Sequence, residues 1–325
     1  MELSKSSKIR ILIKYFVFVA IFFVLLSIGS VFLDPVKLGL DNNLFEREEY
    51  LTGILGEDKN TIDVVVLGDS ESFGLLSPMH LWQDMGIASY IAGQGGQRTV
   101  EEYYALKKIL KHQKPKLVIL ETNNVFDEVG FFSEGKFVAA TTVYHYFPLV
   151  KYHSVWKNIF ENNTNNQNHF NGFEIRANIA PYTGGDYIFP TEEIHKIDPI
   201  IQYYYDKTID LCKENNIDVL LTWAPSPIHF SYDKHNAMQQ YADKNNIPFI
   251  DMNILDDLNI DLNGDMLDGG DHINIYGSIK VTKYLEEYFK NQYELPDRRN
   301  DSRYTKWNER CAQFMEQLSK VPGLE

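Results

Sequence analysis

A Gly-Asp-Ser turn follows an apolar run in the stretch VVVLGDSESFG, Val64 to Gly74. A serine hydroxyl attacks a carbonyl only when a base removes its proton and hydrogen-bond donors stabilise the oxyanion that forms. Ser70 is therefore a candidate nucleophile if such helpers exist elsewhere in the chain. The alternative is that Asp69 and Ser70 only end a strand and cap the helix that follows.

His272 is the candidate base for this serine. It lies in LDGGDHINIYGSIKVTKYLEEYF, between a Gly-rich acidic loop and an amphipathic segment. Asp268 comes four residues before it and Asp271 directly before it. Because a serine base requires a carboxylate that orients its imidazole, both aspartates are candidates.

Two further segments offer donors for an oxyanion. IAGQGGQRT holds three glycines whose backbone N–H groups could approach a substrate, and LETNNVF places Asn123 and Asn124 directly after an apolar run. Each signal is ordinary by itself, since Gly-rich loops make turns and Asn often ends strands. Together with the backbone N–H of Ser70, one glycine amide and one Asn amide could hold an oxyanion.

These residues fall at the ends of predicted strands. A short apolar run precedes a polar turn in NTIDVVVLGDS, PKLVILETNN, IDVLLTWAPS and IPFIDMN, which is typical of strands buried on both faces of a parallel sheet. Helical segments over about 100–112, 199–215, 235–245 and 275–291 separate or follow these strands. The alternation predicts an α/β fold with a doubly wound parallel sheet, whose ligands bind outside the carboxyl ends of the strands.

The regular alternation lapses after Asn124, in an aromatic and Asn-rich stretch too long for a simple connection. We expect an insertion at about residues 128–198, either a surface excursion or a lid or docking element over the site. ELPDRRNDSRYTKWNERCAQFMEQL predicts a polar turn followed by a closing helix. Cys212 and Cys311 either form one disulfide or remain unpaired in the core.

The N-terminal segment predicts a membrane anchor. Residues 15–33, YFVFVAIFFVLLSIGSVFL, form a run of 19 residues without a charge, and at about 1.5 Å per residue they can cross a hydrocarbon layer about 30 Å thick. Basic residues precede the run, so the positive-inside rule keeps residues 1–14 in the cytoplasm and makes residues 40–325 extracytoplasmic. A cleaved signal peptide is the alternative, although the apolar run is longer than that of a usual signal.

Composition limits the partners of the chain. Its 325 residues are 44% hydrophobic and 23% charged, which is ordinary for one large globular domain. The net charge of −14 argues against nucleic acid, because phosphate binding needs a concentrated basic surface. His229, Asp233 and His235 lack a recognised ligand spacing, so we expect neither a metal nor another cofactor.

The order Ser, Gly, Asn, His resembles that of the SGNH (GDSL-like) hydrolase superfamily over roughly residues 63–289. The resemblance implies a flavodoxin-like sheet, with Ser70 as the nucleophile and His272 as the base. It also implies that the amides of Ser70, Gly96 and Asn123 form the oxyanion hole. Gly-Asp-Ser and HINIYG match the family well, whereas LETNN replaces its usual Gly-x-Asn-Asp and the Asn ahead of the second-block glycine is missing.

The resemblance leaves the orienting carboxylate open. The family places its Asp three residues before the His, and this sequence has Gly269 there. Asp268 fits if the loop holds one extra residue, while Asp271 fits only if an adjacent carboxylate can reach the imidazole. We favour Asp268.

A narrower resemblance is carried by SPMHLWQDMGIASY, GGQRTVEEYYALKKILKHQKPKLVILE, DHINIYGSIKVTKYL and LPDRRNDSRYTKWNE. These stretches look like the membrane-anchored SGNH proteins of Gram-positive bacteria that accompany membrane-bound O-acyltransferases. The D-alanyl transfer protein of teichoic acid systems is a more distant relative. The resemblance implies O-acyl transfer or ester hydrolysis on an acylated cell-envelope polysaccharide or teichoic acid, through an acyl-serine, with such an acyltransferase as a partner. The alternative is a non-catalytic anchored binding or scaffold protein with the same fold.

Overall fold

The computed structural model of the chain describes residues 5–32, 49–127, 130–152 and 170–324. The chain divides into two compact units, one made of Met1–Leu44 and Gly135–Asn165, the other of Phe45–Glu134 and Asn166–Glu325. All the residues that the sequence suggests for chemistry belong to the larger unit.

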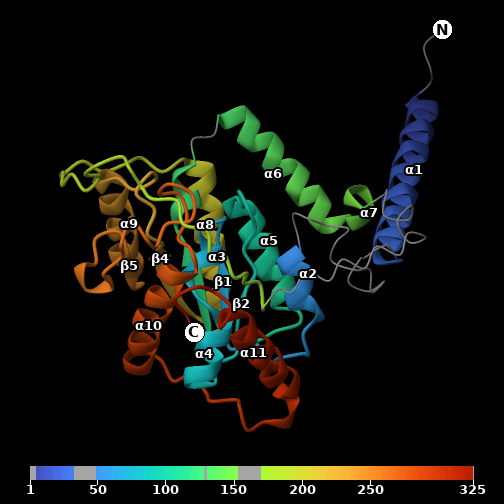
Figure 1. The fold of residues 1–325 in the computed structure, drawn as a ribbon. Coiled ribbons are helices and arrows are strands. Elements are labelled where there is room, and N and C mark those ends of the chain that lie inside the picture. Colours follow the sequence, from blue (N-terminus) through green and yellow to red (C-terminus); the bar gives the residue numbers. More distant parts are fainter. Residues whose placement is uncertain (1–4, 33–48, 128–129, 153–169, 325) are drawn as a thin grey trace. The chain divides into compact units, whose positions relative to one another are not determined.

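The larger unit is built on a five-stranded parallel sheet (Figure 1). Its strands run in the order β2-β1-β3-β4-β5. They are β1 (Val64–Leu67), β2 (Ser89–Ile91), β3 (Leu117–Glu121), β4 (Asp218–Trp223) and β5 (Phe249–Asp251). This order is the flavodoxin-like one, so the predicted α/β fold with a doubly wound parallel sheet is confirmed.

The central strands are apolar because helices cover both faces of the sheet. Every residue of β1 is fully buried, and Val65 lies opposite Tyr90 of β2 and Val118 of β3. The four strands predicted from their apolar runs are all present. The prediction missed β2, because Ser-Tyr-Ile is too short to form a recognisable run.

Two groups of helices pack within the larger unit (Figure 1). In one group α5 (Thr99–Ile109) packs against α8 (Pro199–Glu214); in the other α4 (Pro78–Met85) contacts α10 (Ile275–Gln292) and α11 (Thr305–Leu318). α9 (Tyr232–Asn245) contacts β5, and α11 is the predicted closing helix. The remaining short elements of this unit are α2 (Glu49–Gly56), α3 (Ser72–Leu75) and the 3₁₀ helices η3 (Asn123–Phe126), η5 (Asp256–Leu258) and η6 (Ser302–Tyr304).

The core and the helix caps follow from the sequence. Asn274 caps α10, since its Oδ1 accepts hydrogen bonds from the backbone N–H groups of Tyr276 and Gly277. Cys212 and Cys311 are buried and free, so the alternative of two unpaired core cysteines holds.

Part of the predicted insertion packs on the larger unit without regular secondary structure. Phe170 and Phe173 are buried in its core. The Ala180 N–H donates to Met266 O at 3.0 Å, and the Ile275 N–H donates to Arg176 O at 2.8 Å. The segment from Phe170 to Ala180 therefore packs against the loop that leads into α10.

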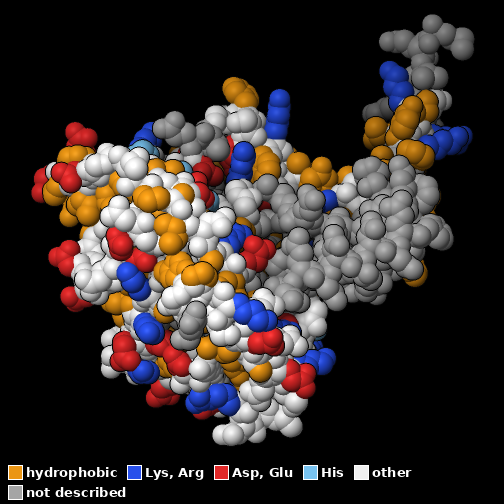
Figure 2. Space-filling view, viewed as in Figure 1, with side chains coloured by type: hydrophobic (Ala, Val, Ile, Leu, Met, Phe, Trp, Pro, Cys, Tyr) orange, Lys and Arg blue, Asp and Glu red, His pale blue; other side chains and the backbone are white. Residues whose placement is uncertain are grey.

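The smaller unit contains α1 (Lys5–Phe32), α7 (Pro148–Lys151) and most of α6 (Phe131–Tyr146). Its segment Ser7–Phe32 is a 26-residue helix that contains an 18-residue window with a mean hydropathy of 2.7. Figure 2 shows hydrophobic side chains on the surface of α1. Within the described residues, this helix is the one long and apolar enough to cross a membrane.

Candidate active site

Ser70 lies three residues beyond the carboxyl end of β1, in the turn that leads into α3. The Ser72 hydroxyl donates to Asp69 O at 2.6 Å and closes this turn. Gly68, which begins it, has a φ of 150°, and a Cβ there would lie 2.5 Å from the Cβ of Glu121. Only glycine fits this position, because β1 and β3 approach each other closely just before the serine.

His272 is held by the loop before α10. An antiparallel bridge between Met266 and Ile273 closes this loop, and Gly269 and Gly270 turn it through φ values of 84° and 107°. The turn lets Asp268 bind His272 twice. Its Oδ2 lies 2.6 Å from Nδ1 of the ring, and its Oδ1 accepts the backbone N–H of His272 at 2.8 Å. A carboxylate on Nδ1 directs Nε2 toward a substrate or nucleophile.

Asp271 interacts mainly with a different histidine. Its Oδ1 lies 2.8 Å from Nε2 of His229, whereas its Oδ2 lies 3.6 Å from Nδ1 of His272. The hydrogen bond with His229 lowers the pKa of Asp271. Of the two aspartates suggested by the sequence, the structure thus places Asp268 closer to the imidazole of His272.

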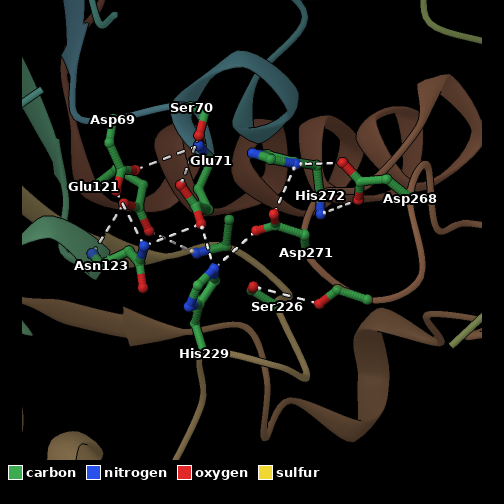
Figure 3. A network of polar contacts seen from close by, with 12 residues as sticks. Asp69, Ser70, Glu71, Glu121, Asn123, Ser226, His229, Asp268, Asp271 and His272 are labelled. Atoms are coloured by element: carbon green, nitrogen blue, oxygen red, sulfur yellow. Dashed lines mark hydrogen bonds and ion pairs between the residues drawn. The ribbon is translucent and has the colours of Figure 1, made fainter. Parts of the chain in front are cut away.

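Ser70 and His272 line the same small pocket, about 10 Å³ in volume, whose other walls include Phe73, Phe173 and Arg176. Nε2 of His272 is buried and has no hydrogen-bond partner among the described residues. Figure 3 shows this nitrogen on the side of the ring that faces Ser70. The Ser70 hydroxyl donates to Glu71 Oε2 at 3.3 Å, and within the described chain no hydrogen bond joins it to His272. Catalytic hydrogen bonds of this kind often tighten only when substrate binds.

The amide of Asn123 is engaged elsewhere, which departs from the expectation for an oxyanion donor. Its Nδ2 donates to Asp69 Oδ2 and to Glu71 Oε1, both at 3.0 Å, and both amide hydrogens are thereby used (Figure 3). Gly96 is exposed at a φ of 56°. Neither Asn123 nor Gly96 lines the pocket that Ser70 and His272 share.

Three buried carboxyl groups surround the amide of Asn123. Glu121, the last residue of β3, accepts the backbone N–H groups of Asn123 at 2.9 Å and Ala224 at 3.3 Å. Asp69 and Glu71 complete this carboxyl cluster. Burial raises the pKa of Glu71 and of Glu121, and the nearby Asp69 raises both further. Burial and the neighbouring carboxyl groups therefore favour the protonated forms of Glu71 and Glu121.

The acidic groups also bear on metal binding. Within the described residues, two sets of three side chains bring ligand atoms within 4.8 Å of one another: Asp69, Glu71 and Glu121, and Glu71, Asp271 and His272. In the first set, the backbone and side-chain N–H groups of Asn123 already bind all three carboxyl groups. In the second set, Asp268 already binds Nδ1 of His272. We therefore assign no metal ligands at this site.

The histidines near β4 and β5 form separate pairs rather than one cluster. Nδ1 of His235 lies 2.8 Å from Asp251, and Nδ1 of His195 lies 2.9 Å from Asp233. His229 instead reaches Asp271, as above. Each of these three histidines therefore has its own acidic partner.

Sequence reasoning missed the roles of Glu71, Glu121 and His229. Two signals were present: Glu71 directly follows the candidate nucleophile, and Glu121 ends the apolar run LVILE, where an ionisable group is unusual. For His229 no local signal exists, because its partner Asp271 is distant in the sequence.

Comparisons with known proteins give fold relatives only. No family model matches the chain, and no curated protein does. Similar solved structures include a GDSL-like lipase from Bacteroides thetaiotaomicron, with 15% identity, a TM-score of 0.40 and coverage of 74% of this chain and 95% of that one. The psychrotrophic esterase EstA from a Pseudoalteromonas species has 13% identity and a TM-score of 0.38, over 70% of this chain and 96% of its own.

An acetyl xylan esterase, AlAXEase, is similar at 17% identity and a TM-score of 0.38, over 70% of this chain and 99% of its own. These descriptions include the GDSL group that the sequence motifs resemble. At such identities and scores, the similarities assign no activity to this chain.

Proposed function

We propose that this chain is a serine-dependent esterase or O-acyltransferase of the SGNH type. The observation that carries the proposal is the pocket shared by Ser70 and His272. There, Nδ1 of His272 is bound by Asp268 while Nε2 is buried without a partner. A nucleophile, a base and an orienting carboxylate in this order are what acyl transfer to serine requires.

In the proposed reaction, His272 Nε2 takes the proton of Ser70 as its oxygen attacks an ester carbonyl. Asp268 stabilises the imidazolium that results. The tetrahedral intermediate collapses, the leaving alcohol takes the proton from His272, and the acyl group remains on Ser70. Water as the second acceptor makes the protein an esterase, and a polymer hydroxyl makes it a transferase.

The pocket supports a short acyl group. Its volume of about 10 Å³ is close to the space needed to hold one water molecule. Phe73 and Phe173 supply apolar walls next to the two reacting residues. An acetyl group suits this space better than a long acyl chain.

The cellular setting that we propose is the outer face of a cell membrane. The apolar helix Ser7–Phe32 supports a single-pass anchor, with residues 1–14 in the cytoplasm and residues 40–325 extracytoplasmic. The narrower sequence resemblance supports an acylated cell-envelope polysaccharide or teichoic acid as substrate. It also supports a membrane-bound O-acyltransferase as a partner.

A second candidate function is that of a non-catalytic anchored scaffold. The observation that favours it is the amide of Asn123, which two carboxyl groups occupy. A scaffold, however, has no need of a His272 held in place by Asp268 beside a serine.

Labelling with a fluorophosphonate separates the two candidates. We expect the larger unit to be labelled on Ser70, and Ser70→Ala and His272→Ala to abolish the labelling. Ser319→Ala, an exposed serine at the end of α11, is the control and should label like the wild type. Labelling that persists in Ser70→Ala contradicts the enzymatic proposal, as does no labelling of the wild type.

Incubation with wall polymers then distinguishes the acceptors. An esterase releases acetate from O-acetylated polymer, whereas a transferase moves the label from an acyl donor to unmodified polymer. The Ser70→Ala variant should do neither, and turnover in that variant contradicts an acyl-serine intermediate.

A further inference from the structure

The carboxyl group of Glu71 lies between the candidate nucleophile and Asn123 (Figure 3). The residue is 4% exposed. Its Oε1 accepts from Asn123 Nδ2 at 3.0 Å and lies 3.5 Å from Nε2 of His229. Its Oε2 faces the Ser70 hydroxyl at 3.3 Å. Protein donors thus hold one oxygen of this group, and the other is directed at the serine.

The neighbours of Glu71 favour a neutral acid. Four elements contribute the charged or titratable groups that face it: the turn after β1, the end of β3, the loop after β4 and the loop before α10. They are Asp69, Glu121, His229, Asp271 and His272. Carboxyl oxygens of Asp69, Glu121 and Asp271 each lie within 4.8 Å of a carboxyl oxygen of Glu71. Carboxyl groups packed this closely away from water favour a proton on one of them.

Glu71 is the natural holder of that proton. Burial, then the hydrogen bond and charge of Asp69, raise the pKa of Glu71, whereas the pKa of Asp271 is lowered. Asn123 donates a hydrogen bond to Oε1 of Glu71, so Oε1 is the accepting, carbonyl oxygen of the protonated carboxyl group. The proton is therefore favoured on Oε2, the oxygen beside Ser70.

We propose that Glu71 is a hydrogen-bond donor of the oxyanion hole, and that Asn123 positions it instead of contacting the oxyanion itself. The inference rests on the proposed acyl transfer at Ser70. It gives Asn123 a role different from the one that the family resemblance implies, and it adds a catalytic residue that lies next to the nucleophile.

The donor acts without being consumed. When Ser70 Oγ bonds to the carbonyl carbon, the π electrons of the carbonyl move to its oxygen and the serine proton moves to His272 Nε2. The Glu71 O–H donates a hydrogen bond to that oxygen and keeps its proton. When the intermediate collapses, the electrons return, the carbonyl reforms and the leaving alcohol takes the proton from His272.

Two substitutions of similar size separate a donor from a space filler. Glu71→Gln keeps a donor at this position, and Glu71→Met removes it while keeping the length of the side chain. We expect kcat for p-nitrophenyl acetate to stay within about 10-fold of wild type in Glu71→Gln and to fall about 10²- to 10³-fold in Glu71→Met. The rate of fluorophosphonate labelling should follow the same order, because the phosphoryl oxygen occupies the same hole.

Glu286 supplies the matched control. It is a buried glutamate whose pKa burial raises to about 7, and it lies in α10 outside the site. Glu286→Gln and Glu286→Met should change the thermal midpoint but leave kcat and labelling rate unchanged. Circular dichroism shows which variants fold. If Glu71→Met does not fold, the folded Glu71→Gln variant decides whether Glu71 acts as the donor.

Each outcome has one meaning. Wild-type kcat in Glu71→Met, or a faster rate, overturns the proposed donor, and a faster rate shows that Glu71 blocks the hole. A loss above about 10²-fold in folded Glu71→Gln also overturns it, because an ionisable group is then required. Failure of the wild type to label at Ser70 overturns the proposed function instead, whatever the Glu71 variants do.

Discussion

Acidic residues lie on both sides of Ser70, and they differ in how far solvent reaches them. On one side the side chain of Asp268 is 42% exposed and binds the ring of His272. On the other side Glu71 and Glu121 are buried, and burial raises the pKa of both. Carboxyl groups thus occur in two environments at one site, one exposed to solvent and one buried. A solvated carboxylate orients a base, and a buried carboxylic acid can donate a hydrogen bond.

The difference follows from where the groups lie in the fold. Asp268 belongs to a surface loop before α10, while Glu121 ends a central strand of the sheet. Solvent reaches the side chain of Asp268, whereas Glu121 is buried, and burial disfavours its charged form. The site therefore holds an exposed half, Asp268 with His272, and a buried half that we call the neutral half, Glu71 with Glu121, on either side of Ser70.

The exposed half gives the largest expected effect. Asp268→Asn should lower kcat by about 10³- to 10⁴-fold, because the amide no longer fixes the tautomer of His272. Steady-state kinetics with p-nitrophenyl acetate measures the loss.

Two matched variants sharpen this prediction. Asp271→Asn should lose less than about 10-fold, since Asp271 binds His229 at 2.8 Å and lies farther from His272. Asp233→Asn breaks a histidine pair outside the site and should retain full activity. A larger loss in Asp271→Asn than in Asp268→Asn would reverse the assignment of the orienting carboxylate.

The neutral half gives an intermediate effect. Asn123→Ala should lower kcat about 10- to 100-fold with little change in KM, because Glu71 loses the donor that holds its Oε1. The combination Asn123→Ala with Glu71→Met should cost no more than Glu71→Met alone, which a purely structural role does not explain.

Asn124→Ala is the matched control for Asn123. Asn124 is buried and donates to Gln97 O at 3.1 Å and to Glu102 Oε1 at 2.6 Å, away from Ser70. We expect it to lower the thermal midpoint and leave kcat within about threefold. Equal losses of kcat in the two Asn variants would show that stability, not positioning, is measured.

The last prediction concerns stability and not the rate of reaction. Glu102 is fully buried, and burial raises its pKa to about 8. The unfolded carboxyl loses its proton above a pH of about 4.3, so the stability from this group is full below that pH. It falls by about 1.4 kcal/mol per pH unit as pH rises toward about 8. Glu102→Gln should flatten this dependence in denaturant titrations between pH 5 and 8.

An exposed residue provides the comparison for Glu102. Glu214→Gln, at the end of α8, should leave the pH dependence of the unfolding free energy as in the wild type. An unchanged slope in Glu102→Gln would show that Glu102 is ionised in the folded protein.

The two halves also differ in how far the sequence predicts them. Asp268 and His272 lie four residues apart in one loop, so their pairing is visible in the chain. The sheet was predictable for a similar reason, because VVVL, LVILE and DVLLTW are local apolar runs. Only β2, with three residues, escaped this pattern.

The neutral half depends on contacts that no local pattern contains. Glu121 ends β3, while Glu71 and His229 follow β1 and β4, and the three meet only because these strands are neighbours in the sheet. Their protonation follows from burial, which is a property of the assembled core. The family resemblance assigned Asn123 to the oxyanion, and the hydrogen bonds of its amide show why spacing alone could not fix that role.

Trapping of an acyl-enzyme tests the central claim most directly. Excess enzyme is mixed with p-nitrophenyl acetate, quenched with acid within one turnover, digested and analysed by mass spectrometry. We predict that the peptide containing Ser70 gains the mass of one acetyl group in the wild type and not in Ser70→Ala. Release of p-nitrophenol without acetyl on Ser70, or the same acetylation in Ser70→Ala, would contradict the claim that this serine attacks the ester.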